Sequence, residues 1–355
     1  MPKLDTLLRL LKDRGGSDLH LAAGLEPRIR LHGALEPVEG WPALTNAALH
    51  DLLLEIASEK QWREYTRAHD LDFAYGLEGV ARFRANFFYQ GNGAAAVFRV
   101  IPERITPLEE LNLPKAVESL AHLQQGLILV TGPTGSGKST TLAAIIDRIN
   151  STYSRHIVTI EDPVEFVHQN RKSVVSHREV GAHTGGFGAA LRAAVRQDPD
   201  VILVGEMRDL ETISQAVTAA EMGVLVFGTL HTNNAPKTID RLIDVFPSEQ
   251  QPQVRTTLSE SIAGIVSQLL LPTADGKGRC AVNEILLKVP ALANVIREGN
   301  TPMLYSIIQA GKTAGMQTMD DALAELVARG RVSAEDACAK AVDKARFEKL
   351  VPAGV

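Results

Sequence analysis

The stretch LILVTGPTGSGKST, residues 127–140, decides the fold class of this chain. An apolar run, Leu127–Val130, leads directly into GPTGSGKS, which fits the pattern G-x-x-x-x-G-K-[ST] and precedes the helical stretch Thr140–Arg148. In this context the glycines let backbone N–H groups wrap around phosphate oxygens, and the amino end of the following helix adds positive potential. We therefore expect a phosphate-binding loop between a buried strand and a helix.

The roles of single residues in this loop follow from the chemistry of nucleotide phosphates. We expect Lys138 to reach the β- and γ-phosphates and the hydroxyl of Ser139 to bind Mg²⁺. The expected ligands are therefore ATP or ADP with Mg²⁺. The predicted nucleotide-binding residues are Gly132, Pro133, Thr134, Gly135, Ser136, Gly137, Lys138, Ser139 and Thr140.

The apolar pattern on either side of the loop predicts two different domains. Short apolar runs with helical stretches between them indicate a parallel sheet in an α/β domain. These runs are residues 127–130, 157–160, 201–204 and 224–227. The earlier part of the chain alternates strand-like and helix-like stretches and indicates a small α+β domain with an antiparallel sheet. Its expected strands are 28–31, 71–75, 80–88 and 94–100, with helix-like residues at 46–66 and a helical leucine stripe at Leu4, Leu7, Leu8 and Leu11.

Prolines and helix signals set the expected boundaries. Pro102, Pro107 and Pro114 break regular structure and mark a linker, and Thr318 and Ser333 resemble helix caps of a helical C-terminal part. We expect an N-terminal domain at 1–101, a linker at 102–115, an ATPase core at 116–290 and a C-terminal helical region at 291–355.

Composition narrows the function classes. The 355 residues hold 37 Lys+Arg against 42 Asp+Glu, a net charge of −5, which does not favour sequence-independent nucleic-acid binding. The two cysteines, Cys280 and Cys338, make neither a disulfide framework nor a four-thiolate zinc site. The first residues lack a secretory apolar segment, and no apolar run approaches the roughly 20 residues that span a bilayer. We expect a soluble cytoplasmic protein without zinc.

Acidic residues follow two of the expected parallel strands. Glu206 ends the stretch DVILVGE, and Glu161 begins EDPVE after the run at 157–160. Ligand sites of α/β sheets gather at this edge, where a carboxylate can bind Mg²⁺ or orient the attacking water. Acidic residues at strand ends are also common as helix caps and as solvated loop residues. This structural role is a stronger alternative for Asp162 and Glu165 than for Glu161 and Glu206. We predict Glu206 as a metal-binding and catalytic residue and Glu161 as catalytic.

A histidine and several arginines complete the candidates. His231 follows the run at 224–227 in GTLHTN, where it is suited to hydrogen bond the γ-phosphate, although a lone histidine is often an ordinary loop residue. Arg82, Arg84 and Arg99 alternate with apolar side chains, which by itself indicates strands with one wet and one dry face. Phosphoryl transfer often needs an arginine from another element, so these residues are also candidates for charge stabilisation.

Taken together, the motifs resemble the secretion-superfamily ATPases, and within them the type IV pilus retraction (twitching motility) ATPases. The resemblance extends in order over nearly the whole chain. It rests on Ser17–Leu21, the loop at 132–139, Thr159–Glu165, Arg192–Asp209, Gly228–Asn234, Ser267–Pro272, Asn294–Glu298 and Gly315–Asp320.

This resemblance implies a hexameric motor whose subunits each have a PAS-like N-terminal domain and a RecA-like ATPase domain. It places Glu161 in an acidic "Asp box", Glu206 at the end of Walker B and His231 in a "His box". Arg84 and Arg99 are the best positional matches to the arginines that approach the γ-phosphate. The implied partner is an inner-membrane pilus platform protein. The motor would act at the cytoplasmic face of the inner membrane, with membrane contact only through that partner.

Alternatives remain open beside this reading. Pilus-extension and type II secretion ATPases usually carry a paired-CxxC zinc insertion and a long extra N-terminal domain, which two isolated cysteines and a loop already reached at Gly132 argue against. An accessory retraction ATPase is a further alternative. In the C-terminal retraction signature of the family, Ala293 replaces an arginine, and this substitution concerns the efficiency of retraction or the choice of partner. A RecA-like nucleic-acid translocase would need a basic or aromatic surface, and a P-loop small-molecule kinase would leave the His231 segment unexplained.

Overall fold

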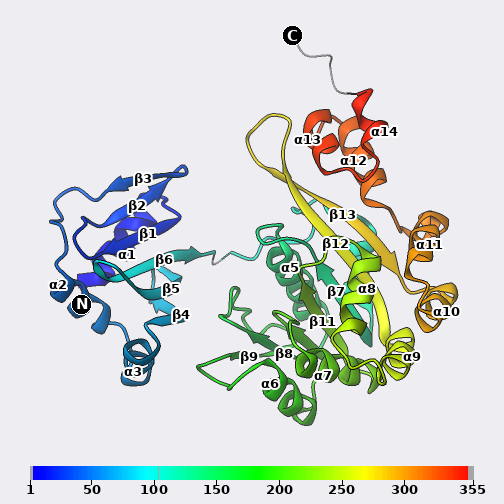
Figure 1. Ribbon diagram of the computed structural model, residues 1–355, viewed down its shortest axis with the longest axis horizontal. Coiled ribbons are helices and arrows are strands. Elements are labelled where there is room, and N and C mark those ends of the chain that lie inside the picture. The colour runs from blue at the N-terminus through cyan, green and yellow to red at the C-terminus, as the bar shows by residue number, and fades with distance from the viewer. Residues whose placement is uncertain (1–2, 103, 351–355) are drawn as a thin grey trace. The chain divides into compact units, whose positions relative to one another are not determined.

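The computed structural model describes residues 3–102 and 104–350. The chain forms two compact units (Figure 1): residues 1–104 with 162–167, and residues 105–161 with 168–355. Each unit has its own hydrophobic core.

The first unit is a six-stranded antiparallel sheet in the order β3-β2-β1-β6-β5-β4. Its strands are β1 (Asp18–Ala22), β2 (Arg28–Leu31), β3 (Ala34–Pro37), β4 (Asp70–Leu77), β5 (Ala81–Gln90) and β6 (Gly93–Ile101). Its helices are α1 (Lys3–Asp13), α2 (Asn46–Leu54) and α3 (Glu59–Ala68). The predicted antiparallel sheet is confirmed, although β1 and β3 were not anticipated.

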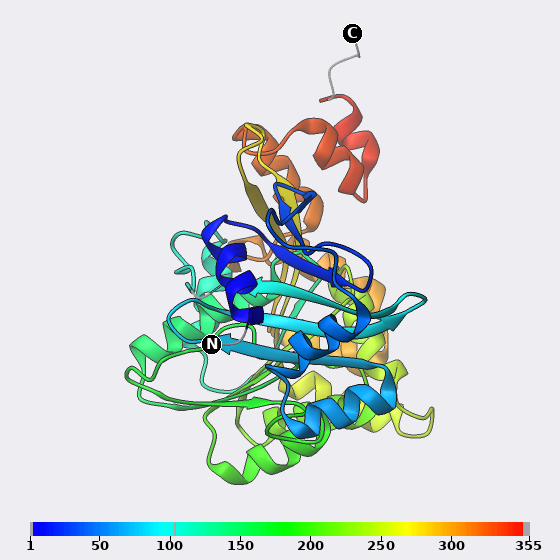
Figure 2. The same cartoon turned by 90° about the vertical axis from the view of Figure 1, so that its left-hand side faces the viewer.

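One face of this sheet is covered by the helices, which lie in front of it in Figure 2. The predicted leucine stripe of α1 is fully buried and packs in one cluster with Phe83, Phe87 and Phe98 of the sheet. Each buried leucine contributes roughly 1.5–3 kcal/mol relative to an exposed one. The amphipathic pattern of α1 therefore supplies much of the contact that fixes it to the sheet.

The helix-like residues at 46–66 form two helices, α2 and α3. α2 ends at Leu54, and Ser58 starts α3 with a capping box: its side chain accepts a hydrogen bond from the Gln61 backbone, and the Gln61 side chain accepts one from the Ser58 backbone. The serine satisfies backbone donors that a continuous helix would pair internally, and this favours a new helix start.

The second unit is built on a seven-stranded sheet in the order β13-β12-β7-β11-β10-β8-β9. Neighbouring strands are parallel except for the antiparallel pair of β12 and β13. The strands are β7 (Gly126–Thr131), β8 (His156–Glu161), β9 (Val174–Glu179), β10 (Val201–Val204), β11 (Leu225–Leu230), β12 (Ile262–Pro272) and β13 (Arg279–Leu287). The four apolar runs predicted as parallel strands all lie in this sheet, in β7, β8, β10 and β11, with one end residue, Val224, falling just before β11.

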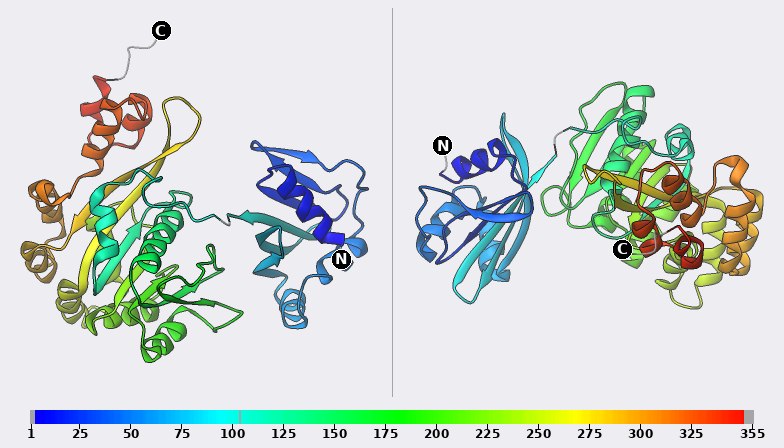
Figure 3. Two further views of the ribbon diagram at one scale, coloured as in Figure 1. Left: turned by 180° about the vertical axis from the view of Figure 1, so that it is seen from behind. Right: turned by 90° about the horizontal axis from the view of Figure 1, so that it is seen from above.

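Helices cover both faces of this sheet, as Figures 1 and 3 show. They are α4 (Lys115–Ser119), α5 (Lys138–Thr152), α6 (Phe187–Ala194), α7 (Leu210–Glu221), α8 (Ala235–Asp244), α9 (Gln251–Ser261), α10 (Pro290–Glu298) and α11 (Leu304–Ala310). Alternate residues of β7 face opposite layers: Leu127 and Leu129 join the core with α6 to α11, whereas Ile128 and Val130 join the core with α4 and α5.

The C-terminal helices are α12 (Met319–Ala328), α13 (Ala334–Lys340) and α14 (Lys344–Glu348). They pack with Leu271 and Val282 of the β12–β13 hairpin in a separate cluster. The predicted caps are confirmed, because the side chains of Thr318 and Ser333 accept hydrogen bonds from the third residue of each helix. Within the described residues, none of the helices is long and apolar enough to cross a membrane.

Candidate functional site

The loop between β7 and α5 has the backbone that a phosphate-binding loop needs. Gly132, Gly135 and Gly137 adopt positive φ values of 142°, 79° and 84°, which residues with a Cβ rarely adopt. Gly137 is also the N-cap residue of α5, and no side chain among the described residues caps this helix end. The loop therefore presents free helical N–H groups and positive potential where an anion can bind.

Lys138 lies over the loop rather than in solvent. Its side-chain Nζ donates hydrogen bonds to the carbonyl oxygens of Gly132 and Pro133, at 2.9 Å and 3.1 Å, and the residue is only 9% exposed. Ser139 and Thr140 follow in the first turn of α5, both partly exposed. Positive charge and two hydroxyl groups thus gather at the same helix end.

Glu206, which lies two residues after β10, is the centre of a small charged cluster. Its Oε1 atom accepts a hydrogen bond from Nε2 of His231 at 2.8 Å and also pairs with Nε of Arg208. The Glu206 side chain is 22% exposed, so the carboxylate is shielded but reachable from solvent. The structure thus brings together two residues that lie 25 positions apart in the sequence.

Glu161 lies beside this cluster at the end of the neighbouring strand. The backbone N–H of Gly205 donates to the carbonyl of Ile160 at 2.8 Å, and a Cβ placed on Gly205 would lie 3.4 Å from Cγ of Glu161. Gly205 therefore allows β8 and β10 to end side by side with their carboxylates on adjacent strand ends.

The common edge of the sheet explains this gathering. β7, β11, β10 and β8 are consecutive, parallel strands, so their carboxyl ends share one edge. At that edge Gly132 and His231 directly follow β7 and β11. Glu206 lies two residues after β10, and Glu161 is the last residue of β8. It is the edge at which α/β sheets bind ligands.

The three candidate arginines belong to the first unit, and the two best positional matches, Arg84 and Arg99, pair there with carboxylates. Arg84 on β5 pairs with Asp72 at 3.3 Å, and Arg99 on β6 pairs with Asp18 at 2.8 Å. Burial lowers the pKa of Arg84. The hydrogen bond and the charge of Asp72, with further carboxylates nearby, raise this pKa by more, and the net shift is upward. Burial raises the pKa of Asp18. The hydrogen bonds that Asp18 accepts from Ser17 and Arg99 lower this pKa by more, and the net shift is downward. Both guanidinium groups are partly or largely exposed and each pairs with a carboxylate of its own sheet.

Two residues at this edge of the sheet were not predicted. Arg208 follows Glu206 by two positions in GEMRD, and its pairing with Glu206 had only that short spacing as a sequence signal. Gln268, on β12, contacts the phosphate-binding loop from a distant part of the chain. Its sequence signals were a polar residue inside an apolar run and a place in the stretch Ser267–Pro272 that carries the family resemblance.

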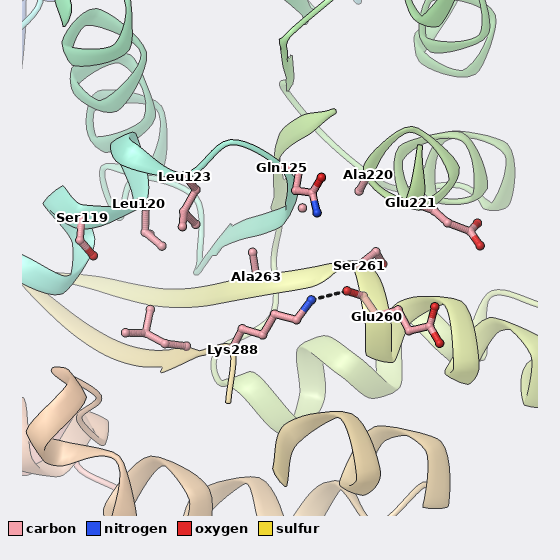
Figure 4. A pocket seen from close by; sticks show the side chains of 12 residues that line it. Ser119, Leu120, Leu123, Gln125, Ala220, Glu221, Glu260, Ser261, Ala263 and Lys288 are labelled. Atoms are coloured by element: carbon pink, nitrogen blue, oxygen red, sulfur yellow. Dashed lines mark hydrogen bonds between the residues drawn. The ribbon is translucent and has the colours of Figure 1, made fainter. Parts of the chain in front are cut away.

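A separate pocket lies at the opposite edge of the sheet. It has a volume of about 560 Å³ and is lined at the amino end of β7 and near the carboxyl ends of α7 and α9 (Figure 4). Nζ of Lys288 donates there to the backbone oxygen of Glu260. None of the predicted site residues lines this pocket.

Comparisons with known proteins point to one family. Residues 14–340 match the family described as "Type II/IV secretion system protein". The chain is 51% identical over 335 residues to the "Type IV pilus retractation ATPase PilT" of Pseudomonas aeruginosa, covering 94% of this chain and 97% of that protein. It is 50% identical over 311 residues to a "Twitching motility protein" of Neisseria gonorrhoeae, covering 88% of this chain and 83% of that protein.

A solved structure agrees with these sequence relatives. The crystal structure of "the Pilus Retraction Motor PilT and Bound ADP" superposes with a TM-score of 0.90 at 46% identity, covering 98% of this chain and 99% of that one. The similarity therefore includes both units of the fold.

Proposed function

The chain belongs to the family of type II/IV secretion system proteins, and from this premise we propose that it is a hexameric motor whose ATP hydrolysis powers type IV pilus retraction. The chain is an ATPase, and it has the fold expected from its sequence: a PAS-like α+β unit followed by a RecA-like ATPase unit with a helical C-terminal part. The observation that carries the proposal is the high identity to a retraction ATPase over nearly the whole chain.

We assign the functional parts of the chain as the sequence suggested. Residues 1–101 form the N-terminal domain, 102–115 the linker, 116–290 the ATPase core and 291–355 the C-terminal helical region. In the core, Gly132–Thr140 bind the nucleotide phosphates. The positive φ values of the loop, its uncapped helix end and the inward ammonium of Lys138 support this assignment.

The same residues fit a Mg²⁺ ion that accompanies the nucleotide. Mg²⁺ prefers hard oxygen ligands, often retains water and is usually held by one or two protein groups together with phosphates. The hydroxyl of Ser139 and the carboxylate of Glu206 are the oxygen donors we assign to it, and both side chains are partly exposed. When bound, the ion neutralises charge on the phosphates.

Glu206 orients the attacking water, and His231 holds the Glu206 carboxylate in place. The hydrogen bond of 2.8 Å between them supports this, because a carboxylate fixed through one oxygen has a defined direction for the other. Arg208 pairs with the same oxygen and balances the charge of the carboxylate. Glu161, on the adjacent strand end, supports the same water from a second side.

Arg84 and Arg99 stabilise the negative charge that spreads over the γ-phosphoryl oxygens during transfer. In the structure each guanidinium pairs with a carboxylate of a neighbouring strand, Arg84 with Asp72 on β4 and Arg99 with Asp18 on β1. Repeated hydrolysis around a homo-hexamer then drives movement of the subunits. The motor acts on an inner-membrane pilus platform protein at the cytoplasmic face of the membrane, and this partner supplies its only membrane contact.

The experiment is a deletion of the gene in its native host, followed by complementation with variants. Loss of a retraction motor leaves cells with surface pili but without twitching, whereas loss of an extension motor leaves cells without pili. The wild-type gene should restore motility and Lys138→Ala should not, while Lys12→Ala, which changes an exposed lysine of α1, should restore it. Cells that lose their pili on deletion would contradict the retraction assignment.

A further inference from the structure

Gln268 is a buried polar residue in the middle of an apolar strand. It lies on β12, directly after Ser267, which pairs in register with Thr131 at the end of β7. The residue is 2% exposed. The proposed reaction gives it no role, although the stretch Ser267–Pro272 is one of those that carry the family resemblance.

Its side-chain amide is engaged at both ends. Nε2 donates to the carbonyl oxygen of Ser136 at 2.6 Å, while Oε1 accepts from Oγ1 of Thr141 at 2.9 Å and from Nδ2 of Asn283 at 3.0 Å. A carbonyl only accepts, so the amide has one orientation that fits the Ser136 carbonyl. Gln268 is therefore locked from one side by α5 and from the other by β13.

The bond to Ser136 sets the direction of a loop N–H group. In a planar trans peptide the C=O of one residue and the N–H of the next point in opposite directions. With the Ser136 carbonyl held toward Gln268, the N–H of Gly137 faces the opposite side of the loop. Backbone N–H groups of this kind bind the phosphates in a phosphate-binding loop.

The main chain of Gln268 also fits closely against the beginning of the loop. A Cβ on Gly132 would lie 2.2 Å from the carbonyl oxygen of Gln268, closer than real Cβ atoms approach. A Cβ on Gly137 would lie 3.0 Å from Nε2 of Gln268. One residue of the neighbouring strand thus contacts both the first and the last glycine of the loop.

We propose that Gln268 is a positioning residue that holds the phosphate-binding loop in its binding conformation by fixing the Ser136–Gly137 peptide. It does not touch the nucleotide, and the inference rests on the proposed nucleotide role of the loop. The loop N–H groups contact phosphate in the ground state and in the transition state alike. Loss of the Gln268 amide should therefore weaken nucleotide binding more than it slows the chemical step.

The test measures equilibrium binding of a fluorescent ADP and steady-state ATP hydrolysis with the full-length protein. Gln268→Met keeps the length of the side chain and removes its hydrogen bonds. We expect the Kd and KM to rise about tenfold or more, with kcat within about twofold of wild type. Ser267→Ala is the matched control: it removes a buried hydrogen bond of 3.0 Å to Thr131 from the adjacent position and should leave the Kd within about twofold of wild type.

Two outcomes would overturn the inference. One is a folded Gln268→Met protein with wild-type Kd and KM; the other is an equal rise in Kd for Ser267→Ala, which would indicate a general structural role. If Gln268→Met does not fold, the variant Thr141→Val provides the test instead. Thr141→Val should raise the Kd for ADP several-fold, and Thr141→Ser should restore the wild-type Kd. A Thr141→Val protein with the affinity of wild type would overturn the inference. Lys138→Ala separates the two proposals, because wild-type nucleotide binding by that variant would contradict the nucleotide site itself.

Discussion

Lowering the pH from 7 to 5 is expected to destabilise the second unit through the imidazole of His168. This residue is 4% exposed and stacks on His177 with 5.9 Å between the ring centroids. Burial, with the nearby charges of His177 and Arg171, lowers its pKa from 6.5 to about 4. The folded protein therefore binds this proton more weakly than the unfolded chain does.

The sign and size of the effect follow from proton linkage. At pH 7 the imidazole is mostly neutral in both states and contributes little. At pH 5 the unfolded chain is almost fully protonated at this residue, whereas the folded protein is mostly neutral. The free energy of unfolding should therefore be about 2 kcal/mol lower at pH 5 than at pH 7 from this group alone, with most of the loss between 6.5 and 4.

Urea unfolding followed by circular dichroism at the two pH values measures this difference. His168→Phe and His168→Gln both remove the titrating group, although they differ in packing and polarity. On going from pH 7 to pH 5, the free energy of unfolding of each variant should fall by about 2 kcal/mol less than that of wild type. This holds whatever the stability of the variant at pH 7. An equal loss in wild type and in both variants would refute the reasoning.

The remaining predictions concern the candidate site. Gly132→Ala should destabilise the protein by roughly 3 kcal/mol or more, because its Cβ would lie 2.2 Å from the Gln268 oxygen at a φ of 142°. In Gly135→Ala the new Cβ meets nothing within 4 Å, so the free energy of unfolding should fall by only roughly 1–2 kcal/mol because of the positive φ. Equal losses for the two variants in urea unfolding would contradict the close contact between Gly132 and Gln268. His231→Phe should lower kcat about tenfold or more without changing nucleotide binding, because the hydrogen bond to Glu206 is lost, and His231→Gln should recover part of the rate. A wild-type kcat for His231→Phe would show that this hydrogen bond does not act in hydrolysis.

The parts of the fold that the sequence predicted are those with local signals. The loop at 132–139 was recognisable because its glycines, lysine and serine have fixed spacing between an apolar run and a helix. The strand β5 showed its nature by alternation, since Phe83 and Phe87 are fully buried while Arg84 is exposed. Period and spacing are written within a few residues, so they can be read without the tertiary structure.

The hairpin of β12 and β13 was not predicted because its signals are ambiguous. A mostly apolar run such as IAGIVSQLLLP suits a buried strand and a buried helix equally well. The polar side chains of Gln268 and Asn283 are buried there and hydrogen bond to each other across the two strands, and Gln268 also donates to Ser136. Such pairing is visible only once the chain has folded.

The candidate site was predictable residue by residue but not as a set of contacts. Glu206 and His231 were each expected at a strand end, and the parallel order of β10 and β11 places these ends together. The pairing of Arg208 with Glu206 and of Arg99 with Asp18 depends on side-chain directions across the folded chain. Arginines are common on strand surfaces, so position alone does not select their partners.

The most direct test of the central claim is the Mg²⁺-dependent ATPase rate measured together with native mass, for wild type and Glu206→Gln. A matched control is Glu221→Gln, which changes an exposed carboxylate at the end of α7. The account predicts hydrolysis by a six-subunit species, its loss in Glu206→Gln with ATP binding retained, and wild-type activity in the control. Hydrolysis by a monomer that is unaffected by Glu206→Gln would contradict both the ring motor and the assigned carboxylate.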